Sequence, residues 1–465
     1  MIIDKKMIYY VVGFLLVISL GIFTIVKNNS NDFLRVSNDY ETNKLEVVVI
    51  GTLNGKVYLQ DQNNIIYSFP KEDIDAEVGS MLKVEYVGEL DKNKDVQMNE
   101  VISYSEIQKE VDKNGIPIIW LDNGMFSKYY ILAKKKIDMM SLDEKIGQLL
   151  LVRYPDTDEE ANSALQNYKL GGYLFFERDF KDKTFNDVVK RYHNLDNISK
   201  IPLLMAVDEE GGKVVRVSSN PNLVEEPFKS SKELYQSGGF DKIKEDTIRK
   251  SEVLSKLGLN LNLAPVVDVS TNSQDYMYSR SLGEDTETTS TYAKTVIEAS
   301  KGFDVSYTLK HFPGYGNNPD THDDAHVDTR SYNEILKNDL PPFQAGINAG
   351  AEAVLVSHNI VDSIDSENPA SLSPSIHNLL RNELGFTGII MTDDIAMGAL
   401  KDIDDATLLA ILAGNDIIIT TDYKTSFQSI KSAINKGTID EDLINKLAFR
   451  IIAWKLYKGL LIEIK

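Results

Sequence analysis

Apolar runs of strand length recur eight times in roughly the last 330 residues of the chain, each behind an amphipathic stretch. The runs cover residues 148–152, 172–176, 203–207, 261–269, 305–309, 353–357, 388–392 and 416–420. Between them lie stretches with apolar positions at helical spacing: 186–198, 240–257, 288–301, 332–348, 375–384 and 406–413. Strands that alternate with helices pair in parallel, and this number and length match a (β/α)8 barrel. The sequence therefore predicts an α/β fold with a TIM-type barrel over residues 136–465.

The ends of these runs carry the functional argument, because a doubly wound open sheet would show the same alternation of strands and helices. Six runs end in polar groups: Asp208-Glu209-Glu210, Asp268, Lys310-His311, His358, Asp393-Asp394 and Thr420-Thr421-Asp422. In a barrel the active site forms where the strands end and the following loops begin. Polar groups that converge from six strands would line a cup with carboxylates and hydrogen-bond donors. Such a cup suits an uncharged, polyhydroxylated ligand such as a sugar.

The stretch 310–326, KHFPGYGNNPDTHDDAH, holds three of the six histidines of the chain. It begins at the end of a buried strand, meets Pro313, which has no N–H to donate, and continues into a loop rich in Gly and Asn. Titratable groups at the end of a buried strand are costly unless they are paired or used. Asp320 and His322 add a second acid/base pair on the same loop. We therefore expect catalytic chemistry in this stretch.

The N-terminus is expected to determine the location of the protein. Residues 7–26 form an uncharged run bounded by lysines, with the length of a helix that crosses a bilayer. A cleavable signal peptide would have a shorter apolar region and a small-residue cleavage site, which Lys27-Asn28-Asn29 does not provide. We therefore expect an uncleaved single-pass anchor. The lysines before it favour a cytoplasmic N-terminus and an extracytoplasmic catalytic domain.

The chain ahead of the barrel divides by composition. Residues 1–27 are expected to form the cytoplasmic tip and the transmembrane anchor, and residues 28–44 a polar linker. Short β-like runs separated by turn signals such as Asn54-Gly55 predict a small β-rich domain at 45–105. A second linker, 106–135, would lead into the barrel. The β-rich domain holds no titratable cluster, which favours a spacer or adhesion role.

Composition excludes several classes of function. The formal charge is −20, from 50 Lys and Arg against 70 Asp and Glu, and it argues against nucleic acid as a partner. The chain has no cysteine, so neither a disulfide nor a thiolate nucleophile is available. A metal-dependent barrel hydrolase would need ligands on an early strand, but the first run ends in Arg153-Tyr154-Pro155-Asp156. We therefore expect neither a metal nor a cofactor.

Five motifs occur in the order found in a known family. They are 208–216 (DEEGGKVVR), 262–269 (NLAPVVDV), 279–283 (SRSLG), 310–314 (KHFPG) and 392–397 (TDDIAM). Together they resemble glycoside hydrolase family 3, and within it the β-N-acetylglucosaminidase (NagZ-type) branch, which acts on peptidoglycan fragments. The likeness extends from about residue 141 to residue 416. It implies a retaining hydrolase of a terminal β-linked sugar.

The resemblance also implies roles for single residues. Asp393 would be the nucleophile, with Asp394 as the alternative, and His322 paired with Asp320 would be the general acid/base. An imidazole suits that task because its ordinary pKa lies near the operating pH, and a nearby carboxylate fixes its tautomer. The sugar contacts would be Asp208, Arg280, Lys310, His311 and Arg216. His358, at the end of a strand, is expected to face the same pocket.

Two departures from the family pattern leave alternatives open. Tyr315 stands where the branch has His, and the loop before Asp320 is one residue shorter, which could displace His322 and make His326 the acid/base. A β-glucosidase of the same family and a catalytically silent, membrane-anchored wall-binding protein are the alternative functions. The sequence leaves the oligomeric state and the role of the β-rich domain open.

Overall fold

The computed structural model describes residues 42–87, 100–320 and 326–461. Its central feature is a sheet of eight parallel strands in the order β15-β12-β10-β9-β8-β7-β6-β16. These strands are β6 (Leu150–Arg153), β7 (Gly172–Phe175), β8 (Leu204–Val207), β9 (Leu261–Asn262), β10 (Ser306–Phe312), β12 (Ala353–Val356), β15 (Ile389–Thr392) and β16 (Ile418–Thr420). A parallel bridge between Met391 and Ile417 joins the two edge strands. The sheet is thus a nearly closed barrel, as predicted, and not an open doubly wound sheet.

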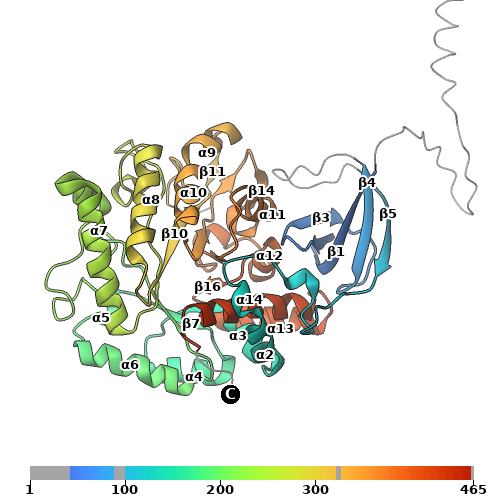
Figure 1. Cartoon of the computed structure of the whole chain (residues 1–465), viewed down its shortest axis with the longest axis horizontal. Helices are drawn as coiled ribbons and strands as arrows, with labels where there is room; N and C mark the ends of the chain where they lie inside the picture. Colours follow the sequence, from blue (N-terminus) through green and yellow to red (C-terminus); the bar gives the residue numbers. More distant parts are fainter. Residues whose placement is uncertain (1–41, 88–99, 321–325, 462–465) are drawn as a thin grey trace, which may run out of the picture.

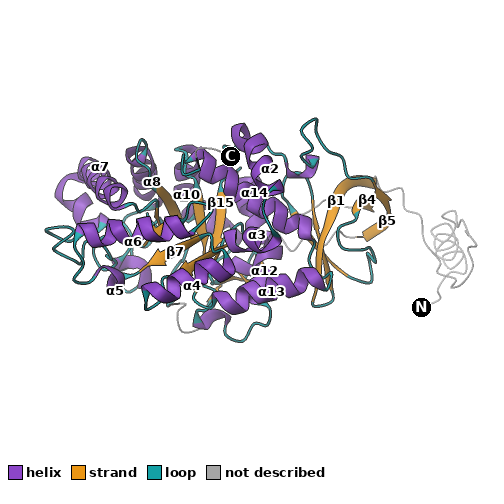
Figure 2. Ribbon diagram, turned by 90° about the horizontal axis from the view of Figure 1, so that it is seen from below, coloured by secondary structure: helices purple, strands orange, loops and turns teal. Residues whose placement is uncertain are grey.

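Helices cover the outside of the barrel (Figure 2). They are α2 (Tyr130–Asp138), α3 (Leu142–Gln148), α4 (Asp158–Tyr168), α5 (Glu177–Phe180), α6 (Phe185–Ile198), α7 (Ser231–Leu257), α8 (Thr286–Ser300), α9 (Tyr332–Asn338), α10 (Leu340–Asn348), α11 (Pro374–Asn378), α12 (Ala406–Ala413), α13 (Tyr423–Asn435) and α14 (Glu441–Tyr457). A three-stranded sheet of β11 (Val327–Asp328), β13 (Ile360–Val361) and β14 (Asp365–Pro369) lies in the loops after β10 and β12.

Several helices begin at the same sequence pattern, a serine followed three residues later by glutamate. Ser141, Ser230 and Ser331 precede α3, α7 and α9, and each accepts a hydrogen bond from the backbone N–H of that glutamate. The glutamate side chain in turn accepts from the N–H of the serine. Each capping box satisfies two N–H groups that a helix start would otherwise leave without partners.

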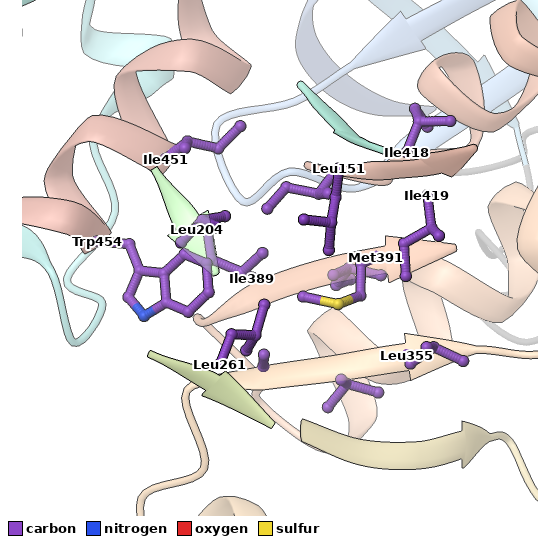
Figure 3. Close-up of a cluster of buried hydrophobic side chains, with 14 of the residues drawn as sticks. Leu151, Leu204, Leu261, Leu355, Ile389, Met391, Ile418, Ile419, Ile451 and Trp454 are labelled. Atoms are coloured by element: carbon purple, nitrogen blue, oxygen red, sulfur yellow. The ribbon is translucent and has the colours of Figure 1, made fainter. Parts of the chain in front are cut away.

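The barrel core is apolar and is covered at its amino end by α14. Leu151, Leu204, Leu261 and Ile389 come from four different strands, and Figure 3 shows Leu204, Leu261 and Ile389 near Trp454 of α14, with Leu151 in the same cluster. Each of these side chains is at most 2% exposed. Burial of side chains of this size stabilises a fold by about 1.5–3 kcal/mol each. The amino end of the barrel is therefore filled by side chains.

A buried lysine helps to hold α14 in this position. Lys455 is fully buried, and its Nζ donates to Gln148 Oε1 (2.8 Å), Gly171 O (3.0 Å) and Pro202 O (2.7 Å). These three acceptors precede β6, β7 and β8, so a single side chain joins three neighbouring strands. Burial lowers the pKa of Lys455 to about 7.

The small β-rich domain is an antiparallel sheet in the order β3-β2-β1-β4-β5, and it lies beside the barrel (Figure 1). Its strands are β1 (Thr42–Leu53), β2 (Lys56–Gln60), β3 (Ile66–Pro70), β4 (Met81–Val87) and β5 (Glu100–Ile107). Because side chains alternate along a strand, β1 serves two cores. Val47 and Val49 belong to the domain's own core, whereas Val48 and Ile50 join the core of the barrel.

Hydrogen bonds also connect the β-rich domain to the barrel. The side chain of Asn378, in α11, accepts from Ile66 N (2.9 Å) and donates to Ile66 O (2.7 Å). Asp440 N donates to Ile50 O (3.0 Å), just ahead of α14. The sheet therefore packs directly on the barrel.

The predicted membrane anchor is corrected. No helix in the described ranges is both long enough and apolar enough to cross a membrane. The segment α7 is interrupted by non-helical backbone at Gly238 and Gly239 and carries charges such as Lys242 and Arg249, and the apolar α12 has only 8 residues. The predicted span, residues 7–26, lies outside the described residues. The single-pass anchor and the extracytoplasmic location inferred from it are therefore not carried forward.

A buried ion-pair network connects α14 to the barrel. Asp416 is 1% exposed and accepts from Arg450 Nε (2.8 Å), Arg381 Nη2 (2.7 Å) and Ile390 N (2.8 Å). Asp416→Ala removes a shared partner of two buried guanidinium groups. We expect the free energy of unfolding, measured in urea, to fall by about 3–5 kcal/mol. The matched control is Asp143→Ala, which removes a half-exposed pair with Lys431 and should cost less than about 1 kcal/mol. Equal losses in the two variants would contradict the role of the network.

Candidate active site

A cavity of about 530 Å³ opens at the carboxyl ends of the barrel strands. Its polar and aromatic lining consists of Arg153, Phe176, Asp208, Glu210, Arg216, Tyr276, Arg280, Lys310, His311, Tyr315, Asp393, Asp394 and Thr421. The structure thus brings together six of the predicted site residues: Asp208, Arg216, Arg280, Lys310, His311 and Asp393. They come from positions as far apart as 208 and 393, and the parallel barrel places all of their strand ends on one rim.

Two carboxylates and two cations form a connected network on one side of this cavity. Lys310 Nζ lies 2.6 Å from Asp208 Oδ1 and 2.7 Å from Glu210 Oε1. Arg280 binds Glu210 through both Nε (3.1 Å) and Nη2 (2.7 Å), which is the forked geometry that guanidinium groups form with carboxylates. Burial alone raises the pKa of Glu210, but the charges of Lys310 and Arg280 outweigh it and hold that pKa well below its ordinary value.

Glu210 was not among the predicted site residues, although it belongs to the strand end at 208–210. The resemblance assigned Arg280 and Lys310 to the sugar, but their contacts with Glu210 depend on the fold. The available signal was the acidic run DEE after a buried strand. Of the two glutamates in this run, Glu210 lines the cavity. Glu209 is fully buried instead and accepts from Arg216 N, Val217 N and the Ser218 hydroxyl.

Asp393 follows β15 directly and lines the cavity. Its Oδ1 accepts from the backbone N–H of Asp394 at 2.8 Å. Burial raises the pKa of Asp393, but the neighbouring His358 and His311, this N–H group and Lys310 together hold it below its ordinary value. The carboxylate is therefore ionised at neutral pH, as a nucleophile must be.

Asp394 has a different environment from that of its neighbour. Its Oδ1 accepts from Ala396 N (2.9 Å) and Thr421 N (3.1 Å), and its Oδ2 accepts from Thr421 Oγ1 (2.6 Å). These bonds tie the loop after β15 to the loop after β16. Asp394 thus shapes the wall that presents Asp393.

His358 lies behind this wall. It is fully buried and is not part of the cavity lining. Its Nε2 is 3.1 Å from the backbone oxygen of Asp394, and its Nδ1 is 2.7 Å from Ser371 Oγ. Sequence position alone predicted that His358 faces the pocket, but the structure places it where it supports the backbone of the Asp393-Asp394 turn.

The side chain of His311 is held by Asp268, which lies in the segment after β9. The Nδ1 of His311 lies 2.8 Å from Asp268 Oδ2, and Asp268 Oδ1 accepts from Tyr315 N at 2.8 Å. This pairing fixes the ring so that Nε2 lies 3.5 Å from Arg280 Nη2, next to the cavity. One buried carboxylate thereby orients both His311 and the first turn of the loop that follows β10.

That loop leads to Asp320, which neighbours Tyr276 at the cavity. The pKa of Tyr276 is raised by burial and by Asp320, and lowered by Arg280, which places the phenol beside both charges. His326 Nε2 lies 3.2 Å from the backbone oxygen of Asp320. The predicted acid/base His322 lies outside the described residues. Asp320 and His326 are the nearest described residues before and after it.

The loop after β10 packs against a buried charged cluster. Arg330 pairs with Asp328 (2.7 Å) and with Asp339 (2.7 Å), and these two carboxylates are 2% and 1% exposed. Gly316 has a φ of +60°, and a Cβ there would come within 2.7 Å of Arg330 Nη2. Only glycine permits this close approach, so the path of the loop is tied to the cluster.

No group of three or more His, Asp or Glu side chains in the described ranges is placed to hold a metal ion. Four charged residues of the cavity, Asp208, Glu210, Arg280 and Lys310, are paired with one another instead. The barrel and the cavity at the carboxyl ends of its strands define the class of (β/α)8-barrel enzymes.

Comparison with known proteins specifies the family. The model of the glycosyl hydrolase family 3 N-terminal domain matches residues 141–454, so the chain belongs to this family. A β-hexosaminidase (LpqI) from Mycobacterium tuberculosis is 28% identical over 333 residues, covering 68% of this chain and 83% of that protein. A β-hexosaminidase from Stenotrophomonas maltophilia is 33% identical over 259 residues, covering 54% and 76%.

Solved structures agree with this assignment. A family 3 β-N-acetylglucosaminidase from Paenibacillus superposes with a TM-score of 0.65 at 26% identity, and the match covers 70% of this chain and 64% of that one. The M. tuberculosis LpqI structure gives a TM-score of 0.62 at 28% identity, covering 69% and 95%. The resemblance noted from the sequence motifs is thereby confirmed, and with it the prediction of a glycoside hydrolase of the β-N-acetylhexosaminidase type.

Proposed function

We propose that the protein is a retaining exo-glycosidase that removes terminal β-linked N-acetylglucosamine from peptidoglycan-derived or related glycans. The observation that carries this proposal is the position of Asp393 in the same cavity as the Asp208, Glu210, Lys310 and Arg280 network. Relatives named β-hexosaminidase and the β-N-acetylglucosaminidase structure support the choice of sugar. The peptidoglycan origin of the glycan rests on the resemblance in sequence.

The charged network suits the recognition of sugar hydroxyl groups. A hydroxyl both donates and accepts, and here Asp208 offers an acceptor while Lys310 and Arg280 offer donors. Lys310 uses two of its three N–H groups on Asp208 and Glu210, which leaves one for a ligand. Because these side chains hold each other in place, little conformational entropy is lost when the sugar binds. Arg216 and His311, which line the same cavity, would complete the contacts.

The reaction would follow two steps with retention. In the first, Asp393 attacks the anomeric carbon while the glycosidic oxygen takes a proton from His322 and leaves with the rest of the glycan. In the second, His322 removes a proton from water, which attacks the same carbon and releases Asp393. Asp320 would fix the tautomer of His322 and stabilise its protonated form.

A panel of 4-nitrophenyl β-glycosides tests the proposal. We expect kcat/KM for the N-acetylglucosaminide to exceed that for the glucoside by at least about tenfold, because the acetamido group adds contacts that contribute on the order of 1.4 kcal/mol or more. The anomer released first, followed by NMR, should be β. A preference for the glucoside would identify a β-glucosidase. No turnover of any member, together with retained binding, would identify a silent binding protein.

A further inference from the structure

Two arginines contact one aromatic ring in the wall of the active-site cavity. The guanidinium carbon of Arg153 lies 4.6 Å from the centre of the Phe176 ring, and that of Arg216 lies 5.5 Å from the same centre. Arg153 is the last residue of β6, Phe176 follows β7 and Arg216 lies in the loop after β8. These strands are neighbours in the barrel, and all three residues line the cavity. They form a single basic and aromatic patch, which we call the Arg153/Arg216 pair.

The hydrogen-bonding capacity of this pair is not used within the described part of the chain. The Nε atoms of both arginines are buried and have no hydrogen-bond partner. Neither guanidinium is in an ion pair with a described carboxylate, whereas Lys310 and Arg280 in the same cavity are paired with Asp208 and Glu210.

Asp179 is the described carboxylate most relevant to Arg153. Against the larger opposite effect of burial, the charge of Arg153 lowers the pKa of Asp179. The carboxylate oxygens of Asp179, however, contact other groups: Phe176 N at 2.7 Å and Arg178 Nε at 3.5 Å. The two cations of the pair therefore stay available to a ligand in the cavity.

Two like charges with buried, unsatisfied donors on one ring are an unfavourable arrangement on their own. The ring face offsets part of the cost through cation–π attraction. A planar or tetrahedral oxyanion would offset far more, because each guanidinium can donate two parallel hydrogen bonds to it.

We propose that Arg153 and Arg216 form an anion-binding subsite of the cavity, which takes a carboxylate or phosphate substituent of the substrate. This inference rests on the proposed glycosidase function and extends it, because an anionic sugar derivative would be preferred to a neutral one. The chain as a whole carries a charge of −20 and repels anions. A local pair of cations is therefore needed to attract an anionic glycan into this cavity.

Two matched substrate pairs test the proposal and separate the two sources of the anion. The first is a β-N-acetylglucosaminyl disaccharide whose second sugar carries a carboxylate ether, compared with its primary amide. The second is an aryl β-N-acetylglucosaminide with a 6-phosphate, compared with its 6-hydroxyl form. In the wild-type protein, kcat/KM for the anionic member of at least one pair should exceed that for the neutral member by roughly tenfold or more. The pair that shows this ratio identifies the source.

The variant Arg153→Gln should bring the ratio close to one. The matched control is Arg249→Gln, since Arg249 also lies over a phenylalanine ring, 5.3 Å from the centre of Phe228, but is exposed on α7 and outside the cavity. The control should keep the wild-type ratio. If Arg153→Gln does not fold, the salt dependence of the wild-type ratio replaces it, and this ratio should fall severalfold between 50 mM and 500 mM salt.

Ratios near one in both pairs for the wild-type protein would overturn the proposal. So would a preference that survives in Arg153→Gln, or a wild-type preference that salt does not reduce. If the wild-type protein cleaves no substrate, the proposed glycosidase function fails, and calorimetry still decides the subsite. The carboxylated disaccharide should then bind roughly tenfold or more tightly than its amide to wild type but not to Arg153→Gln. Equal binding of the two would overturn the subsite as well.

Discussion

Asp393→Asn should lower kcat by roughly 10⁴-fold or more on every β-N-acetylglucosaminide, because an amide of the same shape cannot form the glycosyl-enzyme ester. The dissociation constant of the product sugar should change by less than about tenfold, since Asp208, Lys310 and Arg280 remain in place. Stopped assays with a 4-nitrophenyl substrate give the rate. Calorimetry with N-acetylglucosamine gives the binding constant.

Asp394→Asn is the matched control for this experiment. Both residues line the cavity and are neighbours in sequence, but the oxygens of Asp394 are occupied by Thr421 and Ala396 N. We therefore expect Asp394→Asn to keep the ability to form a covalent intermediate with a fluorinated, slowly hydrolysed substrate, visible as a mass increase of the intact protein. Asp393→Asn should show no such increase. The reverse result would make Asp394 the nucleophile, and near-wild-type rates for Asp393→Asn would reject the assignment altogether.

The second large effect is expected at the proposed acid/base. His322→Ala should slow the hydrolysis of unactivated disaccharides by about 10²- to 10⁴-fold, because their leaving alkoxide needs a proton in the transition state. Aryl glycosides with dinitrophenyl leaving groups need little such help, so formation of the intermediate from them should be nearly unaffected. The comparison of kcat/KM between the two substrate classes measures this difference.

His326→Ala is the control for the acid/base assignment. His326 is on the same loop, and its Nε2 lies 3.2 Å from the backbone oxygen of Asp320. It should retain the wild-type dependence on the leaving group. If His326→Ala shows the selective loss and His322→Ala does not, the shortened loop has moved the acid/base to His326. Equal losses on both substrate classes in His322→Ala would place this function on another residue.

The barrel could be predicted from the sequence because its pattern is local. Six of the strand runs ended in polar groups, and parallel pairing alone is enough to put those ends on one rim. The predicted helix boundaries agree with the structure in some places and not in others. The predicted stretch 406–413 coincides with α12, whereas the predicted start of α7 is nine residues late. The reason is that Gly238 and Gly239 interrupt the helical backbone after its first turns, and the prediction began only beyond them.

Other features depended on contacts that no local pattern encodes. The two faces of β1, for example, pack in different cores, so the β-rich domain and the barrel share apolar side chains. Likewise, His358 and Asp393 both follow strands, but only Asp393 lines the cavity. The difference arises because His358 Nε2 is placed against the Asp394 backbone by the pairing of β12 with β15.

The sequence by itself determined which chemical groups reach the rim, because the alternation of strands and helices and the motifs at the strand ends are properties of neighbouring residues. Only the tertiary structure decided how those groups are paired. Lys310, Arg280 and Glu210 neutralise one another across separations of up to 100 residues, whereas Arg153 and Arg216 keep their donors for a ligand. Such pairings depend on the closure of the barrel, since a distance across a ring of strands is set by every strand in it.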